Sequence, residues 1–218
     1  MRAVAAGTGS GKTTFLNALS NFIPKDLRLI TIEDNAELQI REVPNLVQLE
    51  ARNANVEGCR EITIRDLIKS SLRMRPDWII VGEVRGEETV DMLQAMNTGH
   101  MSMSTGHANS AKDMLSRLET MVLMGMEIPL SAVRGQISSG IDIIVHLGRL
   151  RDRSRKLLEI CELEKELDPV TGKICVNKLF EFKEENVDNY GKIIGAWRKT
   201  GELKNTEKLF AAGFRLPT

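Results

Sequence analysis

A glycine-rich segment near the start of the chain, residues 6–13, limits the possible folds more than any other part of the sequence. It reads Ala-Gly-Thr-Gly-Ser-Gly-Lys-Thr, a phosphate-binding loop in which alanine replaces the usual first glycine. The glycines let consecutive N–H groups curl inward around a phosphate, Lys12 adds an ammonium group, and Thr13 offers a hydroxyl to Mg²⁺. The residues predicted to contact a nucleotide are Gly7, Thr8, Gly9, Ser10, Gly11, Lys12, Thr13 and Thr14. Such a loop joins a buried strand to the start of a helix.

Apolar runs alternate with helical patterns through the first 148 residues. The strands predicted from these runs cover residues 3–6, 29–32, 46–49, 78–81, 101–104 and 141–147. The helices predicted between them cover roughly residues 12–23, 63–74, 90–99, 110–125 and 129–137. Strands that are apolar on both faces and alternate with helices are typical of an α/β fold, with a mainly parallel sheet and helices on both faces. Ligand chemistry should then collect at the carboxyl ends of the strands.

The pattern changes from about residue 149. Residues 157–163 and 174–182 alternate in polarity around a Pro- and Gly-containing turn at 168–172, which predicts an antiparallel hairpin. A helical tail is predicted over residues 202–212. We therefore divide the chain into a core, residues 1–148, and a C-terminal hairpin and helical appendage, residues 149–218.

A basic run leads into that hairpin, with arginine at positions 149, 151, 153 and 155. A run of this kind is usually a solvated rim of the fold. A contact with another subunit or with anionic lipid is the alternative.

Bulk composition excludes several classes of protein. Thirty basic and thirty acidic residues cancel, so the chain carries no overall positive charge for nucleic acid, and we expect no nucleic-acid partner. The three cysteines, at 59, 161 and 175, lack the paired spacing of zinc or redox sites, which favours reduced thiols in a cytoplasmic protein. No apolar run approaches the roughly 20 residues of a membrane-spanning helix, and the first residues do not form a signal peptide. Any membrane role should therefore be peripheral.

Hydrolysis of a bound nucleotide needs a carboxylate that activates water, a group that organises the metal, and a group that contacts the terminal phosphate. Glu33 and Glu83 each follow a predicted buried strand, and His100 and His107 flank the next one. Taken singly, a carboxylate at a strand end is usually solvated, and a histidine usually makes a local hydrogen bond. His146 lies inside an apolar strand and is interpreted as a core residue.

Three segments together resemble the boxes of one family. Residues 31–38 (Thr-Ile-Glu-Asp-Asn-Ala-Glu-Leu), 73–86 (Arg-Met-Arg-Pro-Asp-Trp-Ile-Ile-Val-Gly-Glu-Val-Arg-Gly) and 98–110 are similar to the aspartate, Walker B and histidine boxes of the secretion ATPase superfamily. Residues 93–100 and 116–122 most resemble the CpaF-like ATPases of Flp (tight adherence) pilus assembly. The resemblance is strong over roughly residues 3–156.

This resemblance implies a RecA-like domain that forms a hexamer at the cytoplasmic face of the inner membrane. It implies hydrolysis of ATP with Mg²⁺ to drive pilin assembly through membrane platform proteins. By the same resemblance, Lys12 and Thr13 hold phosphate and Mg²⁺, and Glu33 activates water. Glu83 stands where the family usually has aspartate and would organise Mg²⁺ through water, while His107 would contact the γ phosphate.

Two departures from the family pattern bear on this reading. The segment between His100 and His107 is one residue short, and a one-residue slip in a strand turns the following side chains to the other face, which would misdirect His107. Only five residues precede Ala6, where family members carry an N-terminal domain that helps enclose the nucleotide and is expected to supply arginine fingers. Because an arginine finger can be worth about 10³ to 10⁵ in rate, we expect this polypeptide alone to be a weak ATPase.

Two alternatives to the motor function therefore stand beside it. One is a catalytically weak fragment that binds nucleotide or a partner and acts as an assembly component. The other is a DNA-translocating relative within the same superfamily, and the balanced charge counts against that alternative.

Overall fold

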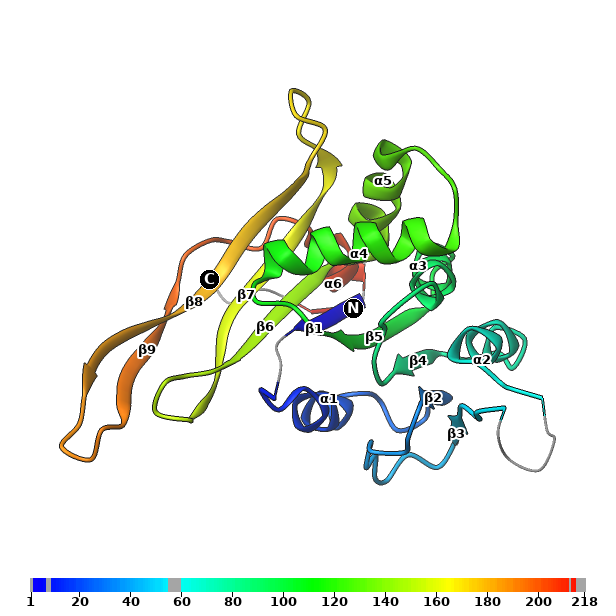
Figure 1. Cartoon of the computed structure of the whole chain (residues 1–218), viewed down its shortest axis with the longest axis horizontal. Helices are drawn as coiled ribbons and strands as arrows, with labels where there is room; N and C mark the ends of the chain where they lie inside the picture. The colour runs from blue at the N-terminus through cyan, green and yellow to red at the C-terminus, as the bar shows by residue number, and fades with distance from the viewer. Residues whose placement is uncertain (1, 7–8, 55–59, 212, 215–218) are drawn as a thin grey trace.

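A single continuous sheet organises the molecule (Figure 1). In this computed structural model, which describes residues 2–6, 9–54, 60–211 and 213–214, nine strands follow the order β3-β2-β4-β5-β1-β6-β7-β8-β9. The strands are β1 (Arg2–Ala6), β2 (Leu29–Glu33), β3 (Leu46–Glu50), β4 (Trp78–Val81), β5 (Met101–Gly106), β6 (Ile143–Arg149), β7 (Arg155–Leu167), β8 (Ile174–Val187) and β9 (Ile193–Lys199). The helices are α1 (Lys12–Ser20), α2 (Ile64–Ser71), α3 (Glu88–Asn97), α4 (Ala111–Gly125), α5 (Leu130–Gly140) and α6 (Glu207–Ala211).

The strands from β3 to β6 are all parallel, as predicted for the first 148 residues. Their pairing aligns Ala6 with Gly106 and Ile32 with Val81, so β1, β2, β4 and β5 end at one edge of the sheet. Each parallel connection runs through a helix or a long loop, as parallel pairing requires. The sites that follow these strands therefore meet at one edge.

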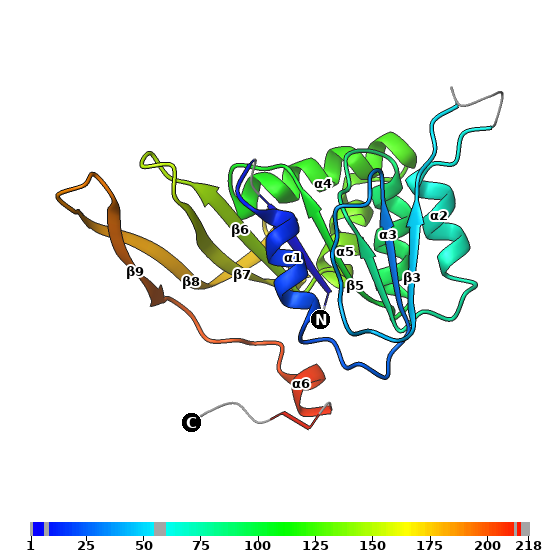
Figure 2. The same cartoon turned by 90° about the horizontal axis from the view of Figure 1, so that it is seen from below.

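Helices cover both faces of the parallel strands. Figure 2 shows α1 in front of the sheet, with α3, α4 and α5 behind it. Successive residues of a strand serve the two faces: Ile80 packs with Leu16 of α1, whereas Ile79 belongs to the large cluster that α2 to α5 cover. All five residues of β2 are buried, because helix or loop covers each face.

Side-chain caps fix where two of the helices begin. At α2 the Thr63 hydroxyl accepts from the N–H of Asp66 at 3.1 Å, and the Asp66 carboxylate accepts from the N–H of Thr63 at 3.1 Å. At α4 the Ser110 hydroxyl accepts from the N–H of Asp113 at 3.0 Å. These caps satisfy N–H groups that the first helical turn leaves without a partner.

The C-terminal part forms a three-stranded antiparallel extension of the same sheet. The predicted hairpin is present as β7 and β8, and β9 adds a strand that the sequence pattern did not predict. Trp197 anchors β9, because its indole N–H donates to the carbonyl of Leu157 at 2.8 Å and its ring meets Phe182 edge to face at 5.6 Å. The predicted helical tail is shorter than expected and is confined to α6.

Two further sequence predictions concern the cysteines and membrane-spanning segments. Cys161 is buried, which raises the pKa of its thiol to about 12, and neither it nor Cys175 is in a disulfide; Cys59 lies outside the described residues. Within the described ranges, no helix has both the length and the apolar character needed to cross a bilayer.

Candidate functional site

The phosphate-binding loop lies between β1 and α1, and β1 is the middle strand of the nine-stranded sheet. Gly9 and Gly11 have φ angles of 59° and 92°, in the left-handed region that glycine adopts without strain. The side chain of Ser10 is buried, and its hydroxyl has no hydrogen-bond partner among the described residues. Gly7 and Thr8 lie outside the described residues. The described part of the loop thus has the backbone curl that the motif predicts, with a hydroxyl oxygen left for a ligand.

The first two residues of α1 face the neighbouring strand ends. The Nζ atom of Lys12 lies 3.3 Å from Nδ1 of His107, and the hydroxyl of Thr13 donates to Glu37 at 3.2 Å. Burial lowers the pKa of Lys12, and the nearby carboxylate of Glu83 partly opposes this shift. The side chain of Thr14, also predicted to contact nucleotide, is exposed.

Glu33 is the last residue of β2 and is only 5% exposed. Its Oε1 atom accepts from the backbone N–H groups of Glu37 and Leu38, at 3.1 and 3.0 Å. Burial raises the pKa of this carboxyl, although the two backbone hydrogen bonds lower it. Gly82 gives the side chain its space, because a Cβ atom at that position would meet Cγ of Glu33 at 2.9 Å.

Glu83 follows β4 and lies at the centre of a small charge network. Its carboxylate is 2.7 Å from Nε2 of His107 and 3.0 Å from the guanidinium of Arg85. Arg85 in turn lies 3.5 Å from Asp34. Burial lowers the pKa of His107, and the carboxylate of Glu83 opposes that shift. The ring thus lies between Lys12 and Glu83.

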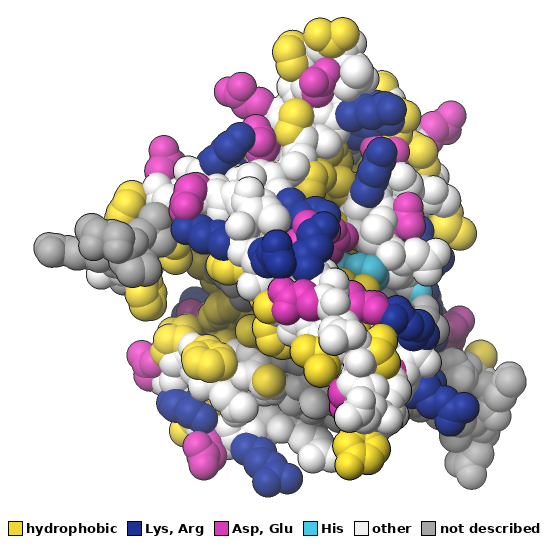
Figure 3. All heavy atoms as spheres, turned by 90° about the vertical axis from the view of Figure 1, so that its left-hand side faces the viewer, with side chains coloured by type: hydrophobic (Ala, Val, Ile, Leu, Met, Phe, Trp, Pro, Cys, Tyr) yellow, Lys and Arg dark blue, Asp and Glu magenta, His cyan; other side chains and the backbone are white. Residues whose placement is uncertain are grey.

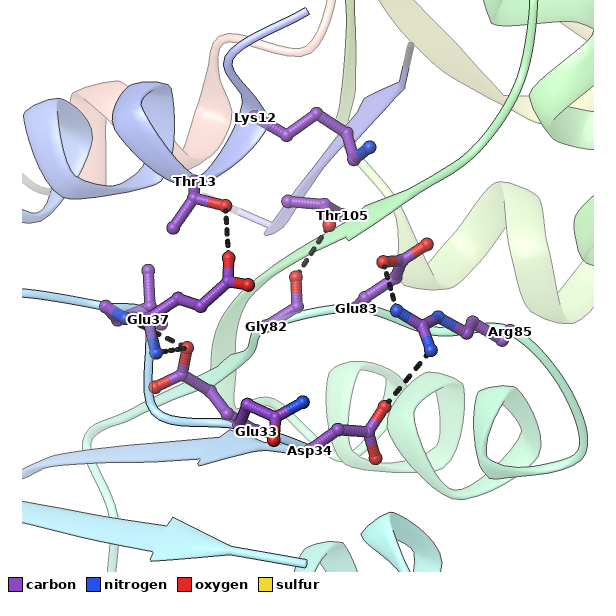
Figure 4. Close-up of a pocket in the computed structure, with 11 residues that line it drawn as sticks. Lys12, Thr13, Glu33, Asp34, Glu37, Gly82, Glu83, Arg85 and Thr105 are labelled. Carbon is purple, nitrogen blue, oxygen red and sulfur yellow. Dashed lines mark hydrogen bonds and ion pairs between the residues drawn. The ribbon is translucent and has the colours of Figure 1, made fainter. Parts of the chain in front are cut away.

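These side chains line a pocket of about 180 Å³ (Figure 4). In this view Lys12 and Thr13 come from α1 on one side, and Glu33, Asp34, Glu83 and Arg85 come from the strand ends on the other. The pocket is lined by Lys12, Thr13, Glu33, Asp34, Asn35, Glu37, Leu38, Gly82, Glu83, Arg85 and Thr105. The Thr105 hydroxyl donates to the carbonyl of Gly82 at 2.6 Å, which ties the end of β5 to the end of β4.

The structure brings Glu33, Glu83 and His107 to one edge. His107 points toward Lys12 and Glu83 despite the shorter segment before it. His100 does not join them, because it precedes β5 and lies at the opposite end of that strand, where its N–H donates to the carbonyl of Ala95. His146, interpreted from sequence as a core residue, is 8% exposed within β6.

Sequence reasoning assigned no role to Glu37 or Arg85, although both lie in the segments that carry the family resemblance. Glu37 is four residues beyond Glu33, and Arg85 is two residues beyond Glu83. Their closeness in sequence to the predicted site residues was the signal that could have identified this carboxylate and this guanidinium. Whether the side chains of Glu37 and Arg85 point into the pocket depends on the paths of the loops that carry them. The sequence pattern does not predict these paths.

Oxygen donors dominate the pocket, which suits a hard cation such as Mg²⁺. In the part of the chain that the structure describes, no group of three or more His, Cys, Asp or Glu side chains is arranged to hold a metal. Mg²⁺ at phosphate sites is commonly held by one or two protein ligands together with substrate phosphates. The donor set therefore fits a cation that arrives with a nucleotide.

This sheet order, with a phosphate-binding loop at the central strand, defines a RecA-like domain. The profile of the family described as Type II/IV secretion system protein matches residues 1–188. The chain belongs to that family.

Relatives of known sequence agree with this assignment. A Mycobacterium tuberculosis protein named for conjugal transfer is 45% identical over 161 residues, which are 73% of this chain and 45% of that protein. The type IV secretion system protein VirB11 of Brucella abortus is 40% identical over 149 residues, covering 66% of this chain and 41% of that protein. The chain spans less than half of the length of these two relatives.

Solved structures share the fold. The VirB11 ATPase from the Brucella suis type IV secretion system, in complex with sulphate, has a TM-score of 0.67 and 36% identity, covering 74% of this chain and 49% of that one. The pilus retraction motor PilT with bound ADP has a TM-score of 0.55 and 26% identity, covering 81% of this chain and 46% of that one. The RecA-like fold predicted from the resemblance is thus confirmed.

Proposed function

We propose that this chain binds ATP with Mg²⁺ and hydrolyses it as a motor subunit of a type II/IV secretion or pilus assembly system. One observation carries the proposal: Lys12 of the phosphate loop and the strand-end carboxylates of Glu33 and Glu83 line one pocket, and His107 lies beside it, 3.3 Å from Lys12 and 2.7 Å from Glu83. The relatives support it, since one solved structure is of a VirB11 ATPase and another is of PilT with bound ADP.

Lys12 and the loop N–H groups would hold the β and γ phosphates, helped by the positive end of α1. The buried hydroxyl of Ser10 and the left-handed Gly9 fit this role, because Ser10 leaves a hydrogen-bonding group and Gly9 leaves open space for a ligand. Thr13 and Glu83 would hold Mg²⁺, Glu83 through water. The cation neutralises charge on the phosphate oxygens when it is bound.

Glu33 is suited to activate water. Its Oε1 atom is held by two backbone N–H groups, so Oε2 is the atom that would accept a proton from water. A carboxyl whose pKa is raised is a better base near neutral pH than an exposed one. Attack of the water oxygen on the γ phosphorus then breaks the bond to the bridging oxygen and releases ADP and phosphate.

His107 is placed to sense the γ phosphate. In the structure without nucleotide its ring lies between Lys12 and Glu83. A terminal phosphate bound at Lys12 would compete for both of these contacts. The histidine would then exchange its contact with Lys12 for a hydrogen bond to a phosphate oxygen.

The finer parts of the proposal follow from the family resemblance. We place the protein at the cytoplasmic face of the inner membrane, as a homohexamer that acts on membrane platform proteins of an Flp-type pilus. No nucleic-acid partner is included. The mycobacterial relative is named for conjugal transfer, but the balanced charge of this chain does not favour DNA as a partner.

A second candidate function is that of a nucleotide-binding assembly component with little turnover. The size of the pocket favours it: about 180 Å³ is below the roughly 300 Å³ at which drug-sized ligand pockets begin, so the described residues enclose only part of a nucleotide, and a site that does not exclude water favours binding over turnover. The described residues thus form a binding site for the phosphates and the metal. The adenine base would need contacts from further residues.

Mg²⁺-dependent ATP turnover by the purified chain separates the two candidates. We expect Lys12→Ala to abolish turnover, and Glu33→Gln to lower it by about 10²-fold or more while nucleotide still binds. Glu42→Gln is the matched control, because it removes the same charge from a side chain 84% exposed on the loop that follows Glu33. Turnover that is the same in the wild type, Lys12→Ala and Glu33→Gln would exclude the enzyme and leave the binding component.

A further inference from the structure

The turn between β6 and β7 brings a basic side chain against the phosphate loop. A Cβ atom placed on Gly11 would lie 3.6 Å from Cδ of Arg155, the first residue of β7. Figures 1 and 2 show this turn projecting from the end of β6, on the side of β1 away from β5. Figure 3, which faces the outer strands, shows Lys and Arg side chains gathered near the middle of that side. The guanidinium begins one bond beyond Cδ, so it is within reach of a phosphate seated on the loop.

The turn is held firmly in place. The carboxylate of Asp152 accepts from the N–H and hydroxyl of Ser154, at 2.9 and 2.7 Å, and from the N–H of Ile193 at 3.0 Å. These hydrogen bonds, led by the one from the Ser154 hydroxyl, lower the pKa of Asp152 to about 2. Arg151 forms a two-pronged ion pair with Glu184 of β8. Arg155 is therefore presented on a fixed frame, which lowers the entropy lost when it binds a ligand.

Arg155 is exposed and has no ion-pair partner among the described residues. Arg153 on the same turn shares both properties, so exposure and charge do not distinguish the two. Proximity to Gly11 distinguishes them, because the side chain of Arg155 is the one found next to Gly11. Arg153 thus provides a natural control.

The strand order fixes which end of a nucleotide Arg155 would meet. Lys12, Glu83 and His107 gather on the side of the loop that faces β5 and β4, and β6 and β7 lie on the other side of β1. A triphosphate with its terminal phosphate near Lys12, Glu83 and His107 would extend along the loop toward β6 and β7. Its α phosphate would then lie on the side where the turn presents Arg155.

We propose that Arg155 binds the α phosphate of the nucleotide, as a second cationic contact on the side of the loop opposite Lys12. The inference rests on the proposed function, because it assigns a further residue to the same site. Guanidinium suits this task, since it can donate two parallel hydrogen bonds to phosphate oxygens. ADP and ATP share the α phosphate, so Arg155 should contribute equally to the affinity for both.

Titration of the full chain with ADP and with ATP, each with Mg²⁺, tests this contact. We expect Arg155→Ala to raise both dissociation constants by about tenfold, as loss of a charge-assisted contact made by an exposed side chain would. Arg155→Lys should recover part of the affinity, because ammonium keeps the charge but loses the paired donors. Arg153→Ala removes the same charge from the same turn and should leave both constants within about twofold. The melting temperature without nucleotide should match the wild type in all three variants.

Each other outcome has a definite meaning. Equal affinities in Arg155→Ala and Arg153→Ala, with normal binding by the wild type, would overturn the contact and leave the nucleotide site intact. A loss for ATP without a loss for ADP would refute the α-phosphate assignment. Absence of nucleotide binding by the wild type would overturn both this contact and the proposed function.

Discussion

At the scale of single residues, the fold removes the carboxyl group of Glu33 from water, where its charged form would be better solvated. The carboxylate is buried at the end of β2, and backbone N–H groups offset only part of the desolvation. Burial raises its pKa, so the folded protein holds the proton of Glu33 more tightly than the unfolded chain does. A carboxylate buried in this way reduces the stability of the fold at neutral pH.

Glu33→Gln should therefore stabilise the protein in a manner that depends on pH. A raised carboxyl pKa contributes stability that is fully present below the unfolded value of 4.5 and is lost as the pH rises through the folded value. Glutamine keeps the shape and the acceptor oxygen but carries no charge. We expect the variant to exceed the wild type in free energy of unfolding at pH 7.5, with the difference vanishing near pH 4.

Urea unfolding at the two pH values measures this difference. Glu42→Gln, which alters an exposed carboxyl on the following loop, should show no comparable change with pH. A constant difference between Glu33→Gln and the wild type at both pH values would contradict the assigned cause of the shift.

The site residues that could be predicted from sequence are those that lie at the ends of predicted strands. Glu33 and Glu83 each follow a run of apolar residues, and parallel strands end at one edge, so their meeting was predictable. The contact between Thr13 and Glu37 was not, because it depends on the path of the loop after β2. Arg155 lies far from the loop in sequence and approaches it only through the β6–β7 pairing.

At the scale of elements, the strands and helices that could be predicted are those whose local residue pattern matches the structure they form. The buried parallel strands are continuous apolar runs, and α2 and α4 begin with capping residues three apart. β9 has no such signal, since its residues Ile-Ile-Gly-Ala-Trp-Arg-Lys do not alternate and include glycine. It forms because β8 offers an unpaired edge and Trp197 packs across it onto Phe182.

The capping box of α2 should contribute measurably to the stability of the protein. Thr63→Ala removes the hydroxyl that accepts from the N–H of Asp66, and should lower the free energy of unfolding by about 1 kcal/mol. Thr63→Ser should retain most of the stability. Ser70→Ala is the control, since Ser70 is exposed in the last turn of the same helix. The urea midpoint, with an unchanged slope, gives the comparison; a Thr63→Ala midpoint equal to that of Ser70→Ala would show that the cap does not support the helix.

At the scale of the whole molecule, the antiparallel extension shares the core of the parallel strands. Cys161 and Leu163 of β7 are buried in the large cluster that α2 to α5 cover, and Ile174 of β8 packs against it. Backbone pairing is also continuous from β1 through β6 to β7. Neither part can lose its structure without exposing apolar surface of the other, so the stabilities of the two predicted parts should be coupled.

We therefore expect both parts to unfold in one transition. The chain has two tryptophans, Trp78 in β4 and Trp197 in β9, which lie in the two parts of the sheet. The single-tryptophan variants Trp197→Phe and Trp78→Phe report on each part separately, and far-UV circular dichroism reports on the whole. Coincident urea midpoints from all three signals are expected, because the shared core makes the two parts one cooperative unit. If the Trp197 signal changed at clearly lower urea than the other two, the outer strands would be an independent unit, and the Arg155 turn would then be carried on the less stable of the two.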